Sequence, residues 1–284
     1  MEYNERMLRR VLITPTTFEI LEFQRNQNLY IEPSVIPKAK LLKDHSKIVE
    51  SIGSPYVYTI NVNFTKLPDI VFVANGGLSL WGLPESVCIL PQMKYKQRKD
   101  ELPYLEDIFN DQGLITFPFP SNEPFEGQAE AKWFHDGSLL VCGYGHRSTK
   151  ESFEVLDKLL QDIYSSYNVK PPTLLVLPLE SPNYYHLDVA MLEFGGNSCI
   201  VHKRAFSEES IEKLKSVVDV HIIDTKDSFC LNAVVHDGKL LTHILNDRDK
   251  TYLEKTTGLE VVQHDTSIFE KSGGSVRCMI LDIY

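Results

Sequence analysis

The stretch Gly273-Gly274-Ser275-Val276-Arg277-Cys278 places a cysteine behind two adjacent glycines, close to the end of the chain. Glycine lets the backbone approach a ligand closely and adopt torsions that a Cβ atom forbids. A neighbouring cation such as Arg277 lowers the pKa of a thiol and favours the nucleophilic thiolate. Cys278 is therefore a candidate nucleophile. The apolar residues that follow fit a cysteine buried in a last strand equally well.

A histidine and an aspartate stand two residues apart in Tyr184-Tyr185-His186-Leu187-Asp188. In a strand, side chains two residues apart point to the same face, so His186 and Asp188 would share one pocket. Histidine titrates near neutral pH and is the commonest general acid and base, and a nearby carboxylate can orient a substrate or tune the histidine. A histidine with ordinary hydrogen bonds at a strand edge is the simpler interpretation.

Two further stretches place polar side chains next to glycine. Residues 70–73 predict an apolar strand that ends in Asn75-Gly76-Gly77, and α/β proteins bind ligands at the carboxyl ends of strands. In Phe125-Glu126-Gly127-Gln128-Ala129-Glu130, two carboxylates four residues apart could hold a cation through charge-assisted hydrogen bonds. The simpler interpretations are an Asn-Gly turn and an exposed acidic loop.

The composition restricts the class of protein. The chain has 284 residues, of which 43% are hydrophobic and 24% charged, as in an ordinary globular protein. Its formal net charge is −10 and it contains no run of basic residues, so nucleic acids and anionic membrane surfaces are poor candidate partners. The sequence predicts neither a signal peptide nor a membrane span. Five scattered cysteines suggest neither disulfides nor a metal site, and we expect a cytoplasmic protein.

Short β-rich runs alternate with helical patterns along the chain, which predicts an α/β fold. No linker rich in Gly, Ser or Pro divides it, so we expect a single domain over residues 1–284. Helices are expected at 38–51, 150–165, 207–216 and 247–257. Strands are expected at 10–13, 70–73, 87–90, 139–143, 173–177, 198–201, 218–223, 233–236, 240–241, 259–262 and 276–281.

These stretches, together and in this order, resemble the guanidino-group-modifying superfamily of arginine deiminases, dimethylarginine hydrolases, amidinotransferases and arginine dihydrolases. The resemblance covers nearly the whole chain and implies the pentein fold, a five-bladed α/β propeller with pseudo-fivefold repeats and its active site in the central channel. The motifs that carry it are 11–15 (VLITP), 72–77 (FVANGG), 125–127 (FEG), 143–149 (GYGHRST), 186–188 (HLD), 231–234 (LNAV) and 273–278 (GGSVRC).

The resemblance also implies a chemistry for the candidate residues. Cys278 would attack the guanidinium carbon and form a covalent thiouronium, while His186 would protonate the departing amine and then deprotonate water. Glu126 and Asp188 would hold the guanidinium nitrogens. The thiol and the histidine suffice for these steps, so we expect no cofactor and no metal.

One departure from the family pattern directs the choice of reaction. Arginine deiminases have aspartate where this chain has Asn75, and asparagine there is the pattern of arginine dihydrolases. That branch has a second asparagine after the first strand, and Asn26 stands at the matching offset. Candidates to hold the α-carboxylate of a substrate are Lys94, Arg98 and Arg147, among which we favour Lys94 and Arg147.

We therefore expect a cysteine hydrolase that converts free arginine to ornithine, ammonia and carbon dioxide. The alternatives are a dimethylarginine hydrolase or an arginine deiminase, which release citrulline, and an amidinotransferase, for which the chain looks short. A pentein that binds arginine without turnover is the alternative outside the enzymes. The expected partner is a small guanidino molecule, and a homo-oligomer stays open.

Overall fold

The structure is a computed structural model that describes residues 8–15, 19–20, 27, 29–53, 57–61 and 67–284. Within these ranges, five three-stranded sheets repeat one topology. In each sheet the middle strand pairs antiparallel with one neighbour and parallel with the other. The sheets are β17-β1-β4 (Leu281–Ile283, Arg9–Thr14, Val57–Asn61), β5-β6-β7 (Leu78–Ser79, Val87–Ile89, Ile115–Phe117), β8-β9-β10 (Ala131–Phe134, Leu139–Tyr144, Thr173–Pro178), β11-β12-β13 (Met191–Phe194, Ser198–His202, Asp219–Ile223) and β14-β15-β16 (Val234–His236, Lys239–His243, Glu260–His264). A separate hairpin pairs β2 (Glu19–Ile20) with β3 (Ser34–Val35).

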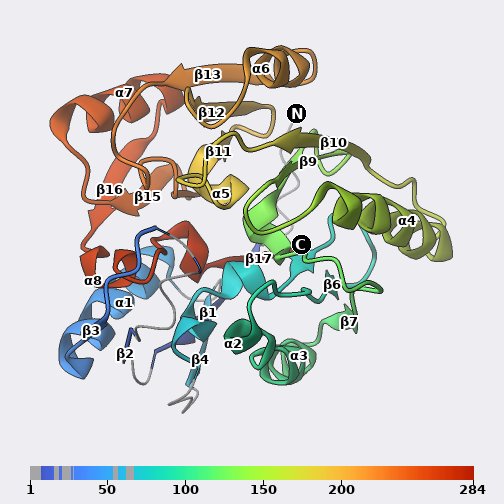
Figure 1. The fold of residues 1–284 in the computed structure, drawn as a ribbon, viewed down its shortest axis with the longest axis horizontal. Coiled ribbons are helices and arrows are strands. Elements are labelled where there is room, and N and C mark those ends of the chain that lie inside the picture. Colours follow the sequence, from blue (N-terminus) through green and yellow to red (C-terminus); the bar gives the residue numbers. More distant parts are fainter. Residues whose placement is uncertain (1–7, 16–18, 21–26, 28, 54–56, 62–66) are drawn as a thin grey trace.

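Helices connect the parallel strands of every sheet, because two parallel neighbours need a crossover between them. Figure 1 shows these helices at the outside of the molecule, while β17 lies near its centre and shares a sheet with β1 from the other end of the chain. The crossover helices are α1 (Lys38–Ile52), α2 (Lys96–Lys99), α3 (Leu102–Asp111), α4 (Lys150–Ser166), α6 (Glu208–Lys215) and α7 (Asp247–Thr257).

Local sequence explains where the long helices begin and what they bury. Thr149, Ser207 and Asn246 precede α4, α6 and α7, and each side chain accepts a hydrogen bond from a backbone N–H of the first turn. In α4 the buried residues include Phe153, Leu156 and Leu160, which pack in one hydrophobic cluster with strand β9. The four helices expected from the sequence are confirmed to within one or two residues at each end.

Short helices stand before the first strands of the sheets and reach the interior. The 3-10 helices η3 (Val73–Gly76), η4 (Gly127–Glu130) and η5 (Arg277–Met279) precede β5, β8 and β17, and α5 (Leu187–Ala190) precedes β11. Helix η3 packs against both η4 and η5. The remaining short helices are η2 (Pro68–Val71) and α8 (Ser267–Glu270). Four separate segments of the chain therefore meet in the middle of the molecule.

Two strands expected from the sequence are wrong in part or in whole. Residues 70–73 form no strand, because η2 and η3 follow one another there with only Phe72 between them. Of residues 276–281, only Leu281 belongs to β17, and η5 occupies Arg277–Met279. Both stretches are apolar because the turns themselves are buried, so hydrophobicity alone could not distinguish them from strands.

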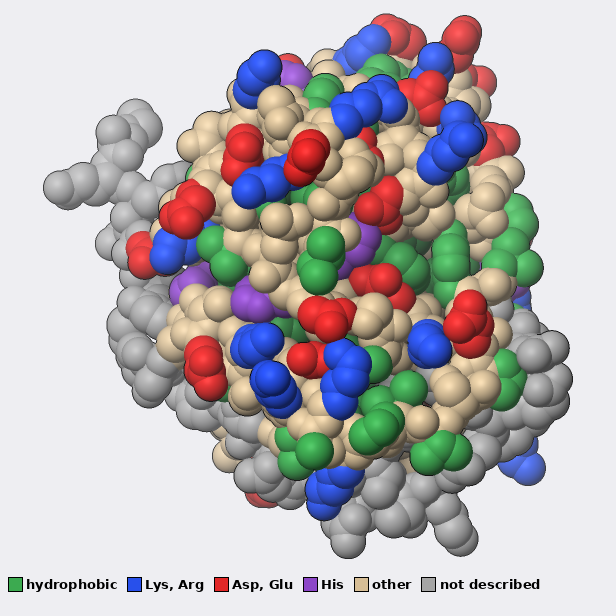
Figure 2. All heavy atoms as spheres, turned by 90° about the vertical axis from the view of Figure 1, so that its left-hand side faces the viewer, with side chains coloured by type: hydrophobic (Ala, Val, Ile, Leu, Met, Phe, Trp, Pro, Cys, Tyr) green, Lys and Arg blue, Asp and Glu red, His purple; other side chains and the backbone are tan. Residues whose placement is uncertain are grey.

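The surface carries charges of both signs. Figure 2 shows Lys and Arg side chains interspersed with Asp and Glu side chains on the face formed by the left-hand side of Figure 1. Within the described ranges, no helix combines the length and the apolar character needed to cross a bilayer.

Candidate active site

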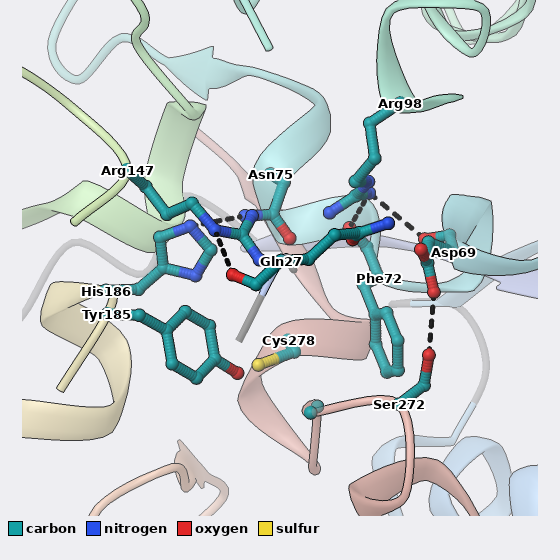
Figure 3. Close-up of a pocket in the computed structure, with 12 residues that line it drawn as sticks. Gln27, Asp69, Phe72, Asn75, Arg98, Arg147, Tyr185, His186, Ser272 and Cys278 are labelled. Carbon is teal, nitrogen blue, oxygen red and sulfur yellow. Dashed lines mark hydrogen bonds between the residues drawn. The ribbon is translucent and has the colours of Figure 1, made fainter. Parts of the chain in front are cut away.

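Cys278 lies in η5 and faces a small interior cavity (Figure 3). Its Sγ atom lies 3.3 Å from Oδ2 of Asp188 and accepts a hydrogen bond of 3.2 Å from Nδ2 of Asn232. Gly274, four residues earlier, packs so closely against Phe72 that a Cβ atom there would overlap the aromatic ring. The glycine pair therefore allows the cysteine segment to approach η3, and both glycines also line the cavity.

Arg277 does not lower the pKa of the Cys278 thiol, as the sequence analysis had expected. Burial, and after it the carboxylate of Asp188, raise the pKa of the Cys278 thiol well above its ordinary value. The Arg277 guanidinium points elsewhere, with Nη2 2.9 Å from Asp282 and Nη1 donating to the carbonyl of Ile280. The expected lowering of this pKa by Arg277 is wrong, because consecutive residues of a 3-10 turn point in directions about 120° apart.

His186 and Asp188 reach the site from a helix start and not from a strand. His186 stands directly before α5, and Asp188 lies within it, so their expected placement on one face of a strand is wrong. Nε2 of His186 lies 2.8 Å from Oε2 of Glu126 and 3.2 Å from Nδ2 of Asn75. Burial lowers the pKa of His186 and the Glu126 carboxylate opposes that shift. The turn thus aims the histidine and the aspartate at one interior region.

Glu126 already holds a cation that belongs to the protein. Its Oε2 lies 2.7 Å from Nη1 of Arg147, and its Oε1 accepts the backbone N–H of Lys94 at 3.1 Å. Burial alone would raise the pKa of Glu126, but Arg147 and His186 hold it well below the usual value. The Arg147 guanidinium also lies 5.0 Å and 5.2 Å from the ring centroids of Tyr95 and Tyr185, within cation–π range.

Glu130 is the second carboxylate of this loop, and it is as buried as Glu126, so the loop is not an exposed acidic one. Its Oε1 accepts a hydrogen bond from Oγ of Ser148, and its Oε2 accepts one from the backbone of Leu187. Burial, and then the nearby charge of Glu126, raise the pKa of Glu130 well above normal. The two acids are therefore differentiated, with Glu126 ionised and Glu130 held towards its neutral form.

The cavity is lined by five of the residues proposed from the sequence, Cys278, His186, Asn75, Arg98 and Arg147, whereas Glu126 and Asp188 are not part of its lining. It measures about 20 Å³, and Figure 3 shows Cys278, His186, Asn75 and Arg147 around it. Its lining consists of Gln27, Asp69, Phe72, Asn75, Arg98, Arg147, Tyr185, His186, Ser272, Gly273, Gly274 and Cys278.

Of the three cations proposed for a carboxylate, two line the cavity and one does not. Lys94 is exposed, and its ammonium group donates to the carbonyl of His146. Arg98 lines the cavity instead, paired with Glu101 at 2.8 Å. The sequence analysis preferred Lys94 to Arg98, whereas the structure places Arg98 at the cavity and Lys94 away from it. The sequence alone does not show how far a side chain lies from a cavity. Asn26 lies outside the described residues.

Three residues near the site were missed as site residues. Asn232 bonds to the Cys278 thiol, Tyr185 stacks beside Arg147, and Gln27 lines the cavity with a side-chain amide nitrogen that has no partner among the described residues. Asn232 was visible in the 231–234 motif, where a polar residue interrupts an apolar run before a strand. The sequence offered no comparable signal for Gln27.

Comparisons with known proteins agree with this geometry. The family model described as "N,N dimethylarginine dimethylhydrolase, eukaryotic" matches residues 10–284. An uncharacterized protein of Caenorhabditis elegans is 27% identical over 280 residues, covering 97% of this chain and 94% of the relative. The bifunctional arginine dihydrolase/ornithine cyclodeaminase ArgZ of Synechocystis is 28% identical over 221 residues, which are 76% of this chain and 29% of that protein.

A solved structure shows the same fold. The N-terminal domain of ArgZ, bound to product, superposes with a TM-score of 0.83 at 23% identity and covers 97% of both chains. The α/β architecture of this chain is thus the one found in an arginine dihydrolase domain. With the family model matching from the first strand to the last residue, the chain belongs to the dimethylarginine dimethylhydrolase family of guanidino-group-modifying hydrolases.

Proposed function

We propose that this protein hydrolyses the guanidino group of free arginine through a covalent bond to Cys278. The observation that carries the proposal is the convergence of a buried thiol, an adjacent carboxylate and a buried histidine. Cys278 lies 3.3 Å from Asp188, and Cys278 and His186 line one cavity with Asn75. Nucleophile, charge for a cationic substrate and general acid are the groups that this chemistry needs.

Because the pKa of Cys278 is raised, the bound substrate itself is proposed to promote formation of the thiolate. A guanidinium that enters beside Asp188 brings a positive charge next to the thiol, which favours the thiolate. The thiolate attacks the guanidinium carbon, and the proton lost by the thiol passes through His186 to the departing nitrogen. The C–N bond breaks to leave a thiouronium on sulfur. Water then attacks, His186 takes its proton, and the C–S bond breaks.

Asn75 favours a second round of hydrolysis over release after the first. Its Nδ2 atom lies 3.2 Å from Nε2 of His186 and 3.5 Å from Oε2 of Glu126. A neutral amide therefore stands beside the histidine and the glutamate, where arginine deiminases have an aspartate. A neutral amide tolerates an uncharged ureido intermediate that a carboxylate would not favour. Arginine and two waters would then give ornithine, two ammonia molecules and carbon dioxide. The dihydrolase ArgZ among the relatives supports this reaction, and Asn26 stays a predicted second asparagine.

Arg147 is proposed to change partners when substrate binds. A cavity of about 20 Å³ is close to the space that one water molecule needs, so arginine enters only if a lining side chain moves. Displacement of Arg147 would free Glu126 to bind the substrate guanidinium beside Asp188. The displaced Arg147, together with Arg98, is suited to hold the α-carboxylate, and Lys94 is a third candidate.

The architecture around the site is proposed to be the five-bladed pentein propeller. The support is the fivefold repetition of one sheet topology and the four short helices that meet at the interior. An experimental structure would test whether the five sheets surround one axis.

Hydrolysis of methylated arginine is the second candidate, since the family model carries that description. It would use the same thiol and histidine but release citrulline and a methylamine. The two reactions differ in the room around the distal nitrogens.

The decisive experiment counts products. The purified full chain is incubated with arginine, and ornithine, citrulline and ammonia are measured in parallel with a dimethylarginine reaction. Ornithine with two ammonia molecules per arginine supports the dihydrolase, whereas citrulline as the end product contradicts it. Cys278→Ala should abolish turnover. Cys230→Ala serves as the matched control, because Cys230 is equally buried but lies in another core cluster. Arginine binding by calorimetry without turnover would indicate a binding protein.

A further inference from the structure

His243 ends strand β15 and is not among the residues that line the cavity of Cys278. It is 6% exposed and lies between two carboxylates. Its Nε2 lies 3.0 Å from Oδ2 of Asp227, and its Nδ1 lies 3.1 Å from Oε1 of Glu270. An imidazolium carries an N–H at both ring nitrogens, whereas a neutral ring carries only one. In its charged form, His243 therefore bridges Asp227 and Glu270.

The Glu270 side of this bridge leads to the sulfur of Cys278 through Ser275. Oε1 of Glu270 also accepts the hydroxyl of Thr266 at 2.5 Å, and the hydroxyls of Thr266 and Ser275 lie 2.9 Å apart. A hydrogen bond from the backbone of Ser275 to the Cys278 thiol lowers the pKa of that thiol. The carboxylate beside His243 therefore anchors a turn that donates to the sulfur.

The Asp227 side leads to the same sulfur through Asn232. Oδ1 of Asp227 accepts the backbone N–H of Phe229 at 3.0 Å, and the carbonyl of Phe229 accepts the backbone N–H of Asn232 at 2.9 Å. Nδ2 of Asn232 donates to Sγ of Cys278 at 3.2 Å, and this bond also lowers the pKa of the thiol. Two turns thus each place one donor on the sulfur, and each turn contains a carboxylate that contacts His243.

The surrounding charges keep this bridge in place at neutral pH. The carboxylates of Asp227 and Glu270 raise the pKa of His243 to about 9, although burial opposes them.

Further titratable groups face Asp227 from other parts of the chain, namely the ring of His202 at the end of β12, the phenol of Tyr30 and the thiol of Cys230. Burial lowers the pKa of His202 and raises those of Tyr30 and Cys230, so all three are uncharged near pH 7. The charge balance of the bridge is therefore one cation between two carboxylates.

We propose that His243 is a positioning residue for Cys278. As an imidazolium it ties together the two turns that donate to the sulfur, and so it keeps both donors in place. Without the cation, two buried carboxylates lose the charge that they share, and the turns that they anchor can separate. The inference rests on the reactive role proposed for Cys278, but not on which guanidino compound is hydrolysed.

The test measures the reactivity of the thiol instead of turnover. We would follow alkylation of Cys278 by iodoacetamide in the full chain, by mass spectrometry, from about pH 7 to about pH 10.5. His243→Gln should react about tenfold more slowly than the wild type at about pH 7.5, because the thiolate loses donors. The two rates should converge above about pH 9, where the wild-type histidine loses its proton.

Two results would overturn the proposal. Equal rates at about pH 7.5 would show that His243 does not act on the thiol. A difference that persists unchanged to about pH 10.5 would show that the side chain acts through packing alone. Arginine turnover is measured separately, so a chain that fails to hydrolyse arginine but shows the expected alkylation profile would refute only the hydrolase proposal.

His264→Gln is the matched control. His264 is also 6% exposed, and it pairs with His243 in the register of β15 and β16. Its replacement should leave the alkylation of Cys278 unchanged, and an equal slowing in this variant would contradict a specific role for His243. The other four cysteines are all buried, so their alkylation reports whether a variant has loosened as a whole.

Glu270→Gln keeps the proposal testable if His243→Gln does not fold. It preserves the size of the side chain and an acceptor oxygen but removes one charge of the bridge, so it should also slow alkylation of Cys278 at neutral pH. A folded Glu270→Gln protein that reacts at the wild-type rate would contradict the proposal. The route is tested with Asn232→Leu, in which the effect of His243→Gln should shrink because one of the two donors is already gone. An undiminished effect there would exclude the route through Asn232.

Discussion

Asn232 bonds to the Cys278 turn through both ends of its side-chain amide. Its Nδ2 donates to Sγ of Cys278 at 3.2 Å, while its Oδ1 accepts the backbone N–H of Arg277 at 3.0 Å. The same Nδ2 lies 3.2 Å from the carbonyl of Asp188. This asparagine thereby positions the Cys278 thiol and, as a donor to sulfur, partly offsets the rise in the pKa of Cys278 that burial causes.

Asn232→Leu should make Cys278 a weaker nucleophile. The substitution keeps the size of the side chain but removes the donor, so the thiol pKa rises further and alkylation by iodoacetamide shifts to higher pH. The loss of a hydrogen bond to a charged group predicts about a tenfold to hundredfold slower reaction at a fixed pH. Cys278→Ala gives the background from the other cysteines. An unchanged alkylation profile would show that the amide does not act on sulfur.

Asp188→Asn should have the opposite effect on the thiol. The Asp188 carboxylate raises the pKa of Cys278, so its replacement by a neutral amide lowers that pKa and speeds alkylation at neutral pH. Hydrolysis of arginine should fall nonetheless, by about a hundredfold, because the charge that holds the guanidinium is lost. Slower alkylation in this variant would contradict the assigned electrostatics.

Glu126→Gln should lower the pKa of His186. The Glu126 carboxylate raises this pKa through a 2.8 Å contact and so opposes burial. Without it, the imidazolium is disfavoured and the general acid is depleted at neutral pH. NMR titration of the His186 ring measures the shift, and Glu123→Gln, on the exposed part of the same loop, is the control. An upward shift of the His186 pKa would disprove the interpretation.

His243 should make stability depend on pH above neutrality. It lies 3.0 Å from Asp227 and 3.1 Å from Glu270, one in the segment before Asn232 and the other in the segment before Cys278. Although burial opposes it, the two carboxylates raise the pKa of His243 to about 9. Because the folded pKa exceeds the unfolded one, the stabilisation is complete below about pH 6.5 and is lost as the pH rises through about 9.

The measurement compares urea unfolding of the wild type and His243→Gln across this range. The difference in the free energy of unfolding should be largest at the acid end, at most about 3 kcal/mol, and should shrink towards pH 10. A difference that stays constant with pH would show that the ion pairs contribute nothing beyond packing.

Gly127→Ala should cost more than the same change at Gly258. Both glycines have positive φ, of 61° and 71°, so alanine is strained at either position. Only at Gly127 would the new Cβ meet backbone, 2.6 Å from the carbonyl oxygen of Gly77, whereas nothing lies within 4 Å at Gly258. We expect about 1 kcal/mol of destabilisation at Gly258 and about 3 kcal/mol or more at Gly127, measured by urea unfolding. Equal losses would mean that η3 and η4 can separate freely.

Local patterns predicted the elements that local forces form. Helices α4, α6 and α7 start at Thr149, Ser207 and Asn246, since a capping side chain needs only its own first turn. Helix α3 was missed although Leu105, Ile108 and Phe109 show helical spacing and Pro103 lies in its first turn, where proline is favoured. The strand expected at 70–73 was wrong because a buried turn is as rich in apolar residues as a buried strand, so hydrophobicity alone cannot tell them apart.

The order of the motifs along the chain was enough to identify the family, because motif order is a property of the sequence. It also proposed Cys278, His186, Asp188 and Asn75 as site residues. Which groups meet was decided only by the packing of η3, η4, α5 and η5. That packing turns Arg277 away from the thiol and gives Glu126 the cation of Arg147 as a partner. These contacts join residues far apart in the chain, and the burial that shifts their pKa values exists only after the chain has folded.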